Sequence, residues 1–80
     1  MPSYLAVVTV RTDLKPDELA GMADALGARE TRSDAGGATL LVPGEAPDLT
    51  TASRAARQHA AEVLDGYVHD VDVTEDDPGA

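Results

Sequence analysis

Two short runs of β-forming apolar residues constrain the fold of this chain more than any other feature. Residues 4–10 read YLAVVTV and residues 38–42 read ATLLV, and both runs are apolar on the two alternating sides. A strand with one solvated face would alternate apolar and polar side chains instead. The sequence therefore predicts two inner strands, over residues 4–12 and 38–42, with Pro43 and Gly44 ending the second.

Two other segments have the character of edge strands. Residues 28–33, ARETRS, are polar with little alternation, which is typical of a short, solvated edge strand. Residues 68–74, VHDVDVT, alternate between an apolar and an acidic side. We therefore expect both segments at the edges of the sheet.

The segment between the first two predicted strands has the signals of a helix. Pro16 suits the first turn, and the two acids that follow it complement the positive end of the helix dipole. Thr12 or Asp13 is a candidate cap, and Gly27 marks the end. The apolar residues recur at helical spacing. They are Leu19, Met22, Ala23 and Leu26.

A second, alanine-rich helix is predicted before the last strand. Asp48 is a credible N-cap, with Thr50 or Thr51 as alternatives, and Gly66 ends the helix. Small residues allow such a helix to lie close to a sheet. Its apolar face comprises Leu49, Ala52, Ala56, Ala60, Val63, Leu64 and Tyr67.

The predicted order is β-α-β-β-α-β, with the first and third strands inside and the second and fourth outside. Right-handed crossovers turn this order into an antiparallel sheet ordered 4-1-3-2, with both helices on one face. The pattern resembles the ferredoxin-like α+β fold. We expect one domain over residues 1–74, followed by an acidic, flexible tail over residues 75–80.

Composition limits the classes of partner. The 80 residues carry a net charge of −9, which repels nucleic acids and anionic lipids. No basic segment precedes the first apolar run, and that run is shorter than the roughly 20 residues that cross a bilayer. Without cysteine there is no disulfide or thiolate metal site. We therefore expect a cytoplasmic protein that contacts neither nucleic acid nor membrane.

The glycine pair in DAGGAT, residues 34–39, raises the possibility of a phosphate-binding loop. Such loops lead from a strand into a helix, and the Walker type ends in Lys followed by Ser or Thr. Here the glycines lead into a strand and no lysine follows. We interpret Gly36 and Gly37 as a tight hairpin turn at positive φ, with Ser33 or Asp34 bonding the turn backbone.

No metal, cofactor or catalytic constellation is predicted. His59 and Glu62 share a helix face, and His69 lies on the last strand, but closed zinc sites need four placed ligands. None of the three serines has an obvious base beside it. Two arginine pairs, Arg54 with Arg57 and Arg29 with Arg32, could receive a carboxylate or phosphate; we interpret them as solvated charge.

The face of the sheet that the helices leave uncovered is the most informative anomaly. If the alternate residues of the inner strands face the helices, apolar side chains fall on the open face. An uncovered patch of this kind marks an interaction surface. The predicted interface residues are Leu5, Val7, Thr9, Thr39 and Leu41. The first hypothesis is therefore a non-catalytic interaction or regulatory domain that forms a homodimer, or docks on a partner protein, through this face.

Two alternatives follow from resemblance. The topology is similar to that of small regulatory domains of the ACT type, which bind amino acids near the loop between the first strand and the first helix. Here that loop reads RTDLKP, without the glycine common in such domains, and its candidate ligand-binding residues are Asp13, Leu14 and Lys15. Dimeric α+β barrel enzymes share the open-face dimer. That alternative requires His59 or His69 to face an enclosed cavity.

Overall fold

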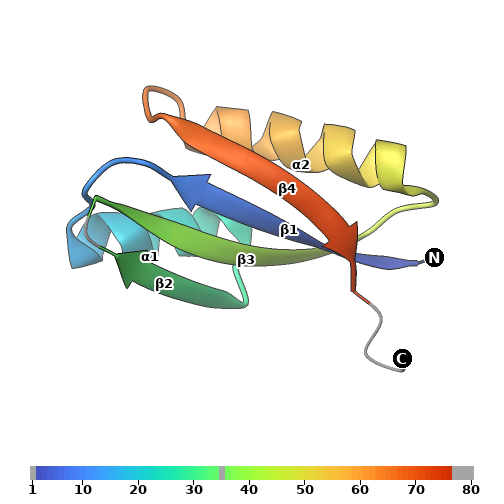
Figure 1. Ribbon diagram of the computed structural model, residues 1–80, viewed down its shortest axis with the longest axis horizontal. Coiled ribbons are helices and arrows are strands. Elements are labelled where there is room, and N and C mark those ends of the chain that lie inside the picture. Colours follow the sequence, from blue (N-terminus) through green and yellow to red (C-terminus); the bar gives the residue numbers. More distant parts are fainter. Residues whose placement is uncertain (1, 35, 77–80) are drawn as a thin grey trace.

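A four-stranded antiparallel sheet with two helices on one face forms the whole of the structure (Figure 1). This computed structural model describes residues 2–34 and 36–76. The elements in chain order are β1 (Ser3–Val10), α1 (Pro16–Leu26), β2 (Glu30–Asp34), β3 (Gly37–Glu45), α2 (Leu49–Val63) and β4 (His69–Glu75). The strand order is β2-β3-β1-β4, so the predicted ferredoxin-like fold is confirmed.

The core lies between the helices and the inner strands. Val8 is paired with Leu40 of β3 on one side and with Val71 of β4 on the other. Together with Val10 and Leu64, Val8 and Leu40 are almost completely buried. α2 packs on β4 and β1, and α1 packs on β3. β1 is thus hydrogen bonded along both edges, as predicted for an inner strand, although the helices cover only one of its two apolar faces.

α1 begins and ends as the proline and glycine predict, but its cap differs. Gly27 adopts a left-handed conformation, with φ 74°, directly after the last helical residue. The N-cap is Lys15, whose backbone N–H donates to the Glu18 carboxylate. The expectation that Thr12 or Asp13 caps this helix is wrong, because the Asp13 carboxylate instead accepts from the Gly36 N–H at 2.8 Å.

α2 has the predicted cap and, with one exception, the predicted face. The Asp48 carboxylate accepts from the Thr51 N–H at 2.7 Å. α2 ends at Val63 with Leu64 as its C-cap, so Gly66, with φ 91°, lies in the following turn and does not itself end the helix as expected. Leu49 is the exception, being 47% exposed. The space beside Tyr4 is filled by small side chains, Ala46 and Ala52, instead.

β3 is longer than the sequence suggests, because it continues through Pro43 to Glu45. The carbonyl of Leu41 points toward the edge shared with β2, where it accepts from the Arg29 N–H. Residues two apart point the same way, so the nitrogen of Pro43 also faces that edge. The β2 pairing stops at Leu41, so no hydrogen bond is lost there.

The turn between β2 and β3 needs its two glycines for different reasons. Gly36 has the positive φ that we predicted, 89°. Gly37 does not share that conformation; a Cβ there would overlap the backbone carbonyl oxygen of Val10. The start of β3 therefore approaches the end of β1 too closely for any side chain.

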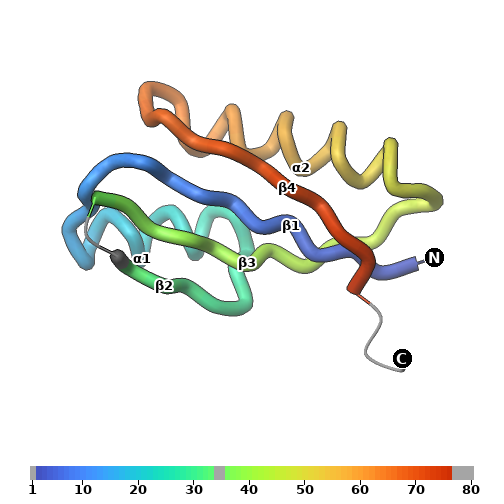
Figure 2. The backbone as a smooth tube through the Cα atoms, viewed as in Figure 1, coloured from blue at the N-terminus to red at the C-terminus, as the bar shows by residue number. Residues whose placement is uncertain are grey.

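The two chain ends bracket one end of the sheet. Tyr4 pairs with Glu75, so the start of β1 and the end of β4 lie side by side (Figure 2). β4 thus extends one residue beyond the predicted domain boundary, and the next residue, Asp76, bonds to Arg29. The rest of the predicted tail, residues 77–80, lies outside the described residues. Among those described, no helix combines the length and apolarity that a membrane crossing requires.

The two strand glycines of β3 provide a matched test of the close approach. We expect Gly37→Ala to lower the free energy of unfolding by roughly 1–3 kcal/mol, because the new methyl group displaces the backbone of Val10. Gly44→Ala, where a Cβ meets no atom within 4 Å, should change it by less than about 0.5 kcal/mol. Urea denaturation measures both. Equal losses of stability in the two variants would contradict the close approach of Gly37 to the backbone of Val10.

The cap of α2 predicts acid sensitivity. Hydrogen bonds from Thr51 hold the pKa of Asp48 below its usual range. A carboxyl whose folded pKa is depressed contributes stability above its unfolded pKa, and this contribution is lost as pH falls through the folded value. Thermal unfolding followed by circular dichroism should show a smaller loss below about pH 4 in Asp48→Asn, which caps without titrating. An identical acid limb in both proteins would contradict this assignment.

Candidate interaction surface

All five predicted interface residues lie on the face of the sheet opposite the helices. In β1 the residues alternate between buried and half-buried, and Leu5, Val7 and Thr9 are half-buried. β3 shows the same alternation, with Thr39 and Leu41 half-buried. Both helices cover the other face, so only neighbouring side chains of the sheet shield these five residues.

The strand register joins the apolar members into one patch. Val7 lies directly beside Leu41, and Leu5 lies beside Pro43. Directly paired residues in antiparallel strands have Cβ atoms about 5 Å apart, so their side chains are in contact. We refer to Leu5, Val7, Leu41 and Pro43 as the central patch. Pro43 was missed because it was assigned to the end of the strand; alternation continued from residues 39 and 41 would have found it.

Charged side chains of the outer strands border the central patch. On β4, Asp70 pairs with Thr9 and Asp72 with Val7. On β2, Arg32 pairs with Thr39 and Glu30 with Leu41. We call Glu30, Arg32, Asp70 and Asp72 the rim. A charged border around an apolar centre is the usual arrangement in protein interfaces.

Ion pairs within the chain engage part of this rim. Arg11 bonds to Asp70, and an Arg32 nitrogen lies 3.9 Å from a Glu30 oxygen. These side chains are more than half exposed, so the pairs contribute little to stability. Each ion pair does place a positive and a negative charge at the same edge of the sheet.

A third ion pair connects the two outer strands. Arg29, directly before β2, lies 3.3 Å from Asp76, directly after β4. These strands stand at opposite edges of the sheet, and the ion pair joins them at the end where Leu5 pairs with Pro43. The Arg29–Asp76 ion pair therefore marks the boundary of the central patch at that end of the sheet.

The candidate ligand-binding loop before α1 is occupied by contacts within the chain. Asp13 accepts from the Gly36 N–H, which ties this loop to the β2–β3 turn. Leu14 is half-buried against the main core. Lys15 is the N-cap residue of α1 and is exposed. Asp13 and Leu14 thus make contacts within the chain, whereas Lys15 bonds through its backbone N–H and leaves its side chain exposed.

The histidines lie on the helix side of the sheet or on α2 itself. His69 shares its side of β4 with Val71, and its Nδ1 lies 2.9 Å from the Tyr67 carbonyl oxygen. His59 is exposed on α2. Within the described residues, no three His, Asp or Glu side chains are grouped as metal ligands.

One other polar contact links α1 to the turn after α2. The Tyr67 hydroxyl donates to the Glu18 carboxylate at 3.0 Å. This hydrogen bond, and the negative charge that it brings close, raise the pKa of Tyr67. The bond is exposed, and we assign it to the packing of the helix layer rather than to a reactive site.

Comparison with known proteins adds no relative: no family model, curated protein or solved structure matches this chain.

The hydrogen bond of Asp13 generates a test of its structural position. Asp13→Ala should lower the free energy of unfolding by roughly 0.5–1 kcal/mol, because the Gly36 N–H loses its acceptor. Asp65→Ala, at an exposed aspartate after α2, is the control and should leave stability unchanged. Chemical denaturation gives both values. Wild-type stability in Asp13→Ala would mean that this carboxylate is free for another purpose.

Proposed function

We propose that this chain is a small, non-catalytic interaction domain that forms a homodimer through the open face of its sheet. The observation that carries the proposal is the central patch: four contiguous apolar side chains on the two inner strands, with both helices on the opposite face. A solvated sheet face normally carries polar residues at such positions. Association would remove these side chains from water.

A second copy is the occupant that the symmetry of the patch favours. The patch is centred between β1 and β3. Consider a twofold axis that lies above the open face, parallel to the strands and midway between β1 and β3. Rotation of a second copy by half a turn about this axis sets β3 of one copy over β1 of the other. Leu41 then meets Val7 of the second copy, so one patch complements itself as an isologous dimer requires.

The charges of the rim are compatible with this dimer, but they do not supply the driving force for association. The same rotation sets β2 over β4, with Arg32 opposite Asp70 and Glu30 opposite Asp72 of the second copy. One contact is attractive and the other repulsive, so the charges nearly balance. Burial of the central patch therefore supplies the driving force for association.

The two alternatives gain no specific support. An amino-acid sensor would use Asp13, Leu14 and Lys15, whose contacts lie within the chain. A dimeric barrel enzyme would need His59 or His69 to face an enclosed cavity; His59 is exposed on α2, and His69 is half-buried at the start of β4. These alternatives remain predictions from the sequence.

A charge in the central patch tests the proposal. Val7→Asp should weaken dimerisation at least about a hundredfold, because two symmetry-related carboxylates would be buried without partners. Light scattering over a concentration series measures the mass of both proteins. The control is Val68→Asp, which introduces the same charge at a valine that is 67% exposed and lies outside the sheet.

Three outcomes are decisive. A wild-type dimer that Val7→Asp dissociates and Val68→Asp preserves supports the proposal. A wild-type monomer at all concentrations contradicts it and leaves docking on a different protein. A dimer that survives Val7→Asp contradicts it as well, since the contact must then lie elsewhere. Circular dichroism establishes that both variants are folded.

A further inference from the structure

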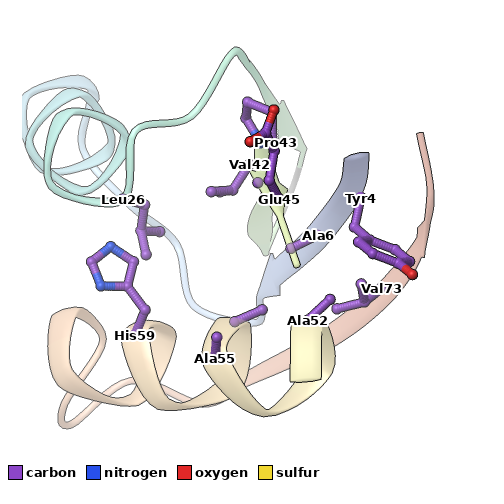
Figure 3. A pocket seen from close by; sticks show the side chains of 12 residues that line it. Tyr4, Ala6, Leu26, Val42, Pro43, Glu45, Ala52, Ala55, His59 and Val73 are labelled. Atoms are coloured by element: carbon purple, nitrogen blue, oxygen red, sulfur yellow. The ribbon is translucent and has the colours of Figure 1, made fainter. Parts of the chain in front are cut away.

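A groove on the helix side of the sheet lies between α2 and the second half of β3 (Figure 3). Its volume is about 260 Å³. Leu26 and His59 line one end, and Tyr4 and Val73 line the other. The groove is on the opposite side of the sheet from the central patch, so a ligand there does not require dimerisation.

Three features of the chain leave this space open. An 11-residue helix spans about 16 Å, whereas the 9-residue β3 spans about 30 Å. α1 therefore ends at Leu26 and leaves Val42 half-exposed, although Val42 is on the helix side. Two residues farther along β3, Gly44 brings no side chain, and a Cβ there would meet no atom within 4 Å. The α2 residues that face the gap are also small; they are Ala52, Ala55 and Ala56.

Among the described residues that line the groove, none directs a carboxylate, ammonium or guanidinium group into it. Glu45 shares the open side of β3 with Leu41 and Pro43, and Figure 3 shows its carboxylate beside Pro43 and directed away from α2. An ion that entered the groove would lose hydration without gaining a counter-charge. The groove therefore favours an uncharged ligand.

His59 gives this apolar space a polar end. Figure 3 shows its ring directed from α2 toward Leu26. Among the described residues, no hydrogen bond involves the ring of His59. A neutral imidazole has one nitrogen that accepts a hydrogen bond, so a hydroxyl group at this end of the groove would find an acceptor.

We propose that the groove binds a small uncharged molecule with a single aromatic ring and a hydroxyl group, as in a simple phenol. The ring would lie over Val42 and Gly44, between Leu26 and the alanines of α2, and the hydroxyl group would donate to His59. The combination of an apolar lining and one placed polar group is typical of small-ligand sites.

The size of the groove favours a small molecule over a protein segment. A dry cavity of about 150 Å³ is enough to hold benzene, so a volume of about 260 Å³ suits one ring with short substituents. A stable protein partner would need about 800 Å² of contact surface on each side, far more than a site for a single ring offers.

Three probes that share one methyl-substituted ring test the ligand class: 4-methylphenol, toluene and 4-methylbenzoate. Titration at about pH 8, followed by amide chemical shifts in NMR spectra, should show saturable binding of 4-methylphenol with shifts at Val42, Gly44 and Ala56. We expect a dissociation constant on the order of 1 mM. 4-Methylbenzoate should bind at least about tenfold more weakly, because its carboxylate loses hydration and the acidic chain repels it. Equal binding of the phenol and the carboxylate, or no saturation by the phenol, would overturn the proposal.

The contact with His59 is tested by comparing two probes in one variant. His59→Leu should weaken binding of 4-methylphenol about threefold, because the hydroxyl group loses its acceptor, and should not weaken binding of toluene. Gln58→Leu, at the neighbouring exposed residue outside the groove, should change neither. If His59→Leu weakened both probes equally, the assignment of the hydroxyl group to His59 would be wrong.

Filling variants locate the site. Ala55→Leu on α2 and Gly44→Val on β3 should each abolish binding of 4-methylphenol, because they occupy the groove from opposite sides. Ala61→Leu, also exposed on α2 but outside the groove, should leave binding unchanged. Thermal unfolding verifies that each variant is folded. Binding that survives either filling variant in a folded protein would overturn the site.

Discussion

β1 is the element on which the rest of the structure depends, because both of its edges are hydrogen bonded and both of its faces are apolar. It pairs with β3 over eight residues and with β4 over seven. On one face, Val8 and Val10 form the centre of the core; on the other, Leu5 and Val7 form half of the central patch. One strand therefore stabilises the fold and presents the surface that we propose for association.

Close packing also constrains the turn beside the end of β1, where there is no room for a side chain at position 37. The carbonyl oxygen of Val10 stands against Gly37, and Asp13 holds the neighbouring Gly36. The turn between β2 and β3 is thus fixed from the β1 side, through contacts between segments that are more than 20 residues apart. Short-range turn chemistry supplies the positive φ of Gly36, but packing against β1 determines that the next residue is also glycine.

Local patterns were sufficient to predict the order of the elements and which strands are inner and which are edge strands, because alternation and helical spacing depend only on neighbours in sequence. The strand order and the open face then followed from the rule that crossovers are right-handed. The errors at Asp13 and Pro43 involve partners that are distant in the chain. Asp13 was expected at the helix cap and bonds instead to a turn 23 residues away. Pro43 was expected to end a strand, and it is tolerated because β2 stops before reaching it. The groove could not be predicted, since it depends on where α1 ends in space relative to β3.

The small side chains of α2 link the two surfaces to the stability of the domain. Ala52 and Ala60 allow the helix to lie close to the sheet, and the alanines between and beside them leave the groove open. Larger residues would fill that space and bury more apolar area, which is worth about 25 cal/mol per Å². The domain therefore buries less apolar surface on the helix side than larger residues would allow, and it also exposes apolar side chains on the open side. In a domain of 80 residues without disulfides, burial of the open face between two copies would recover part of the stability that the groove leaves unused.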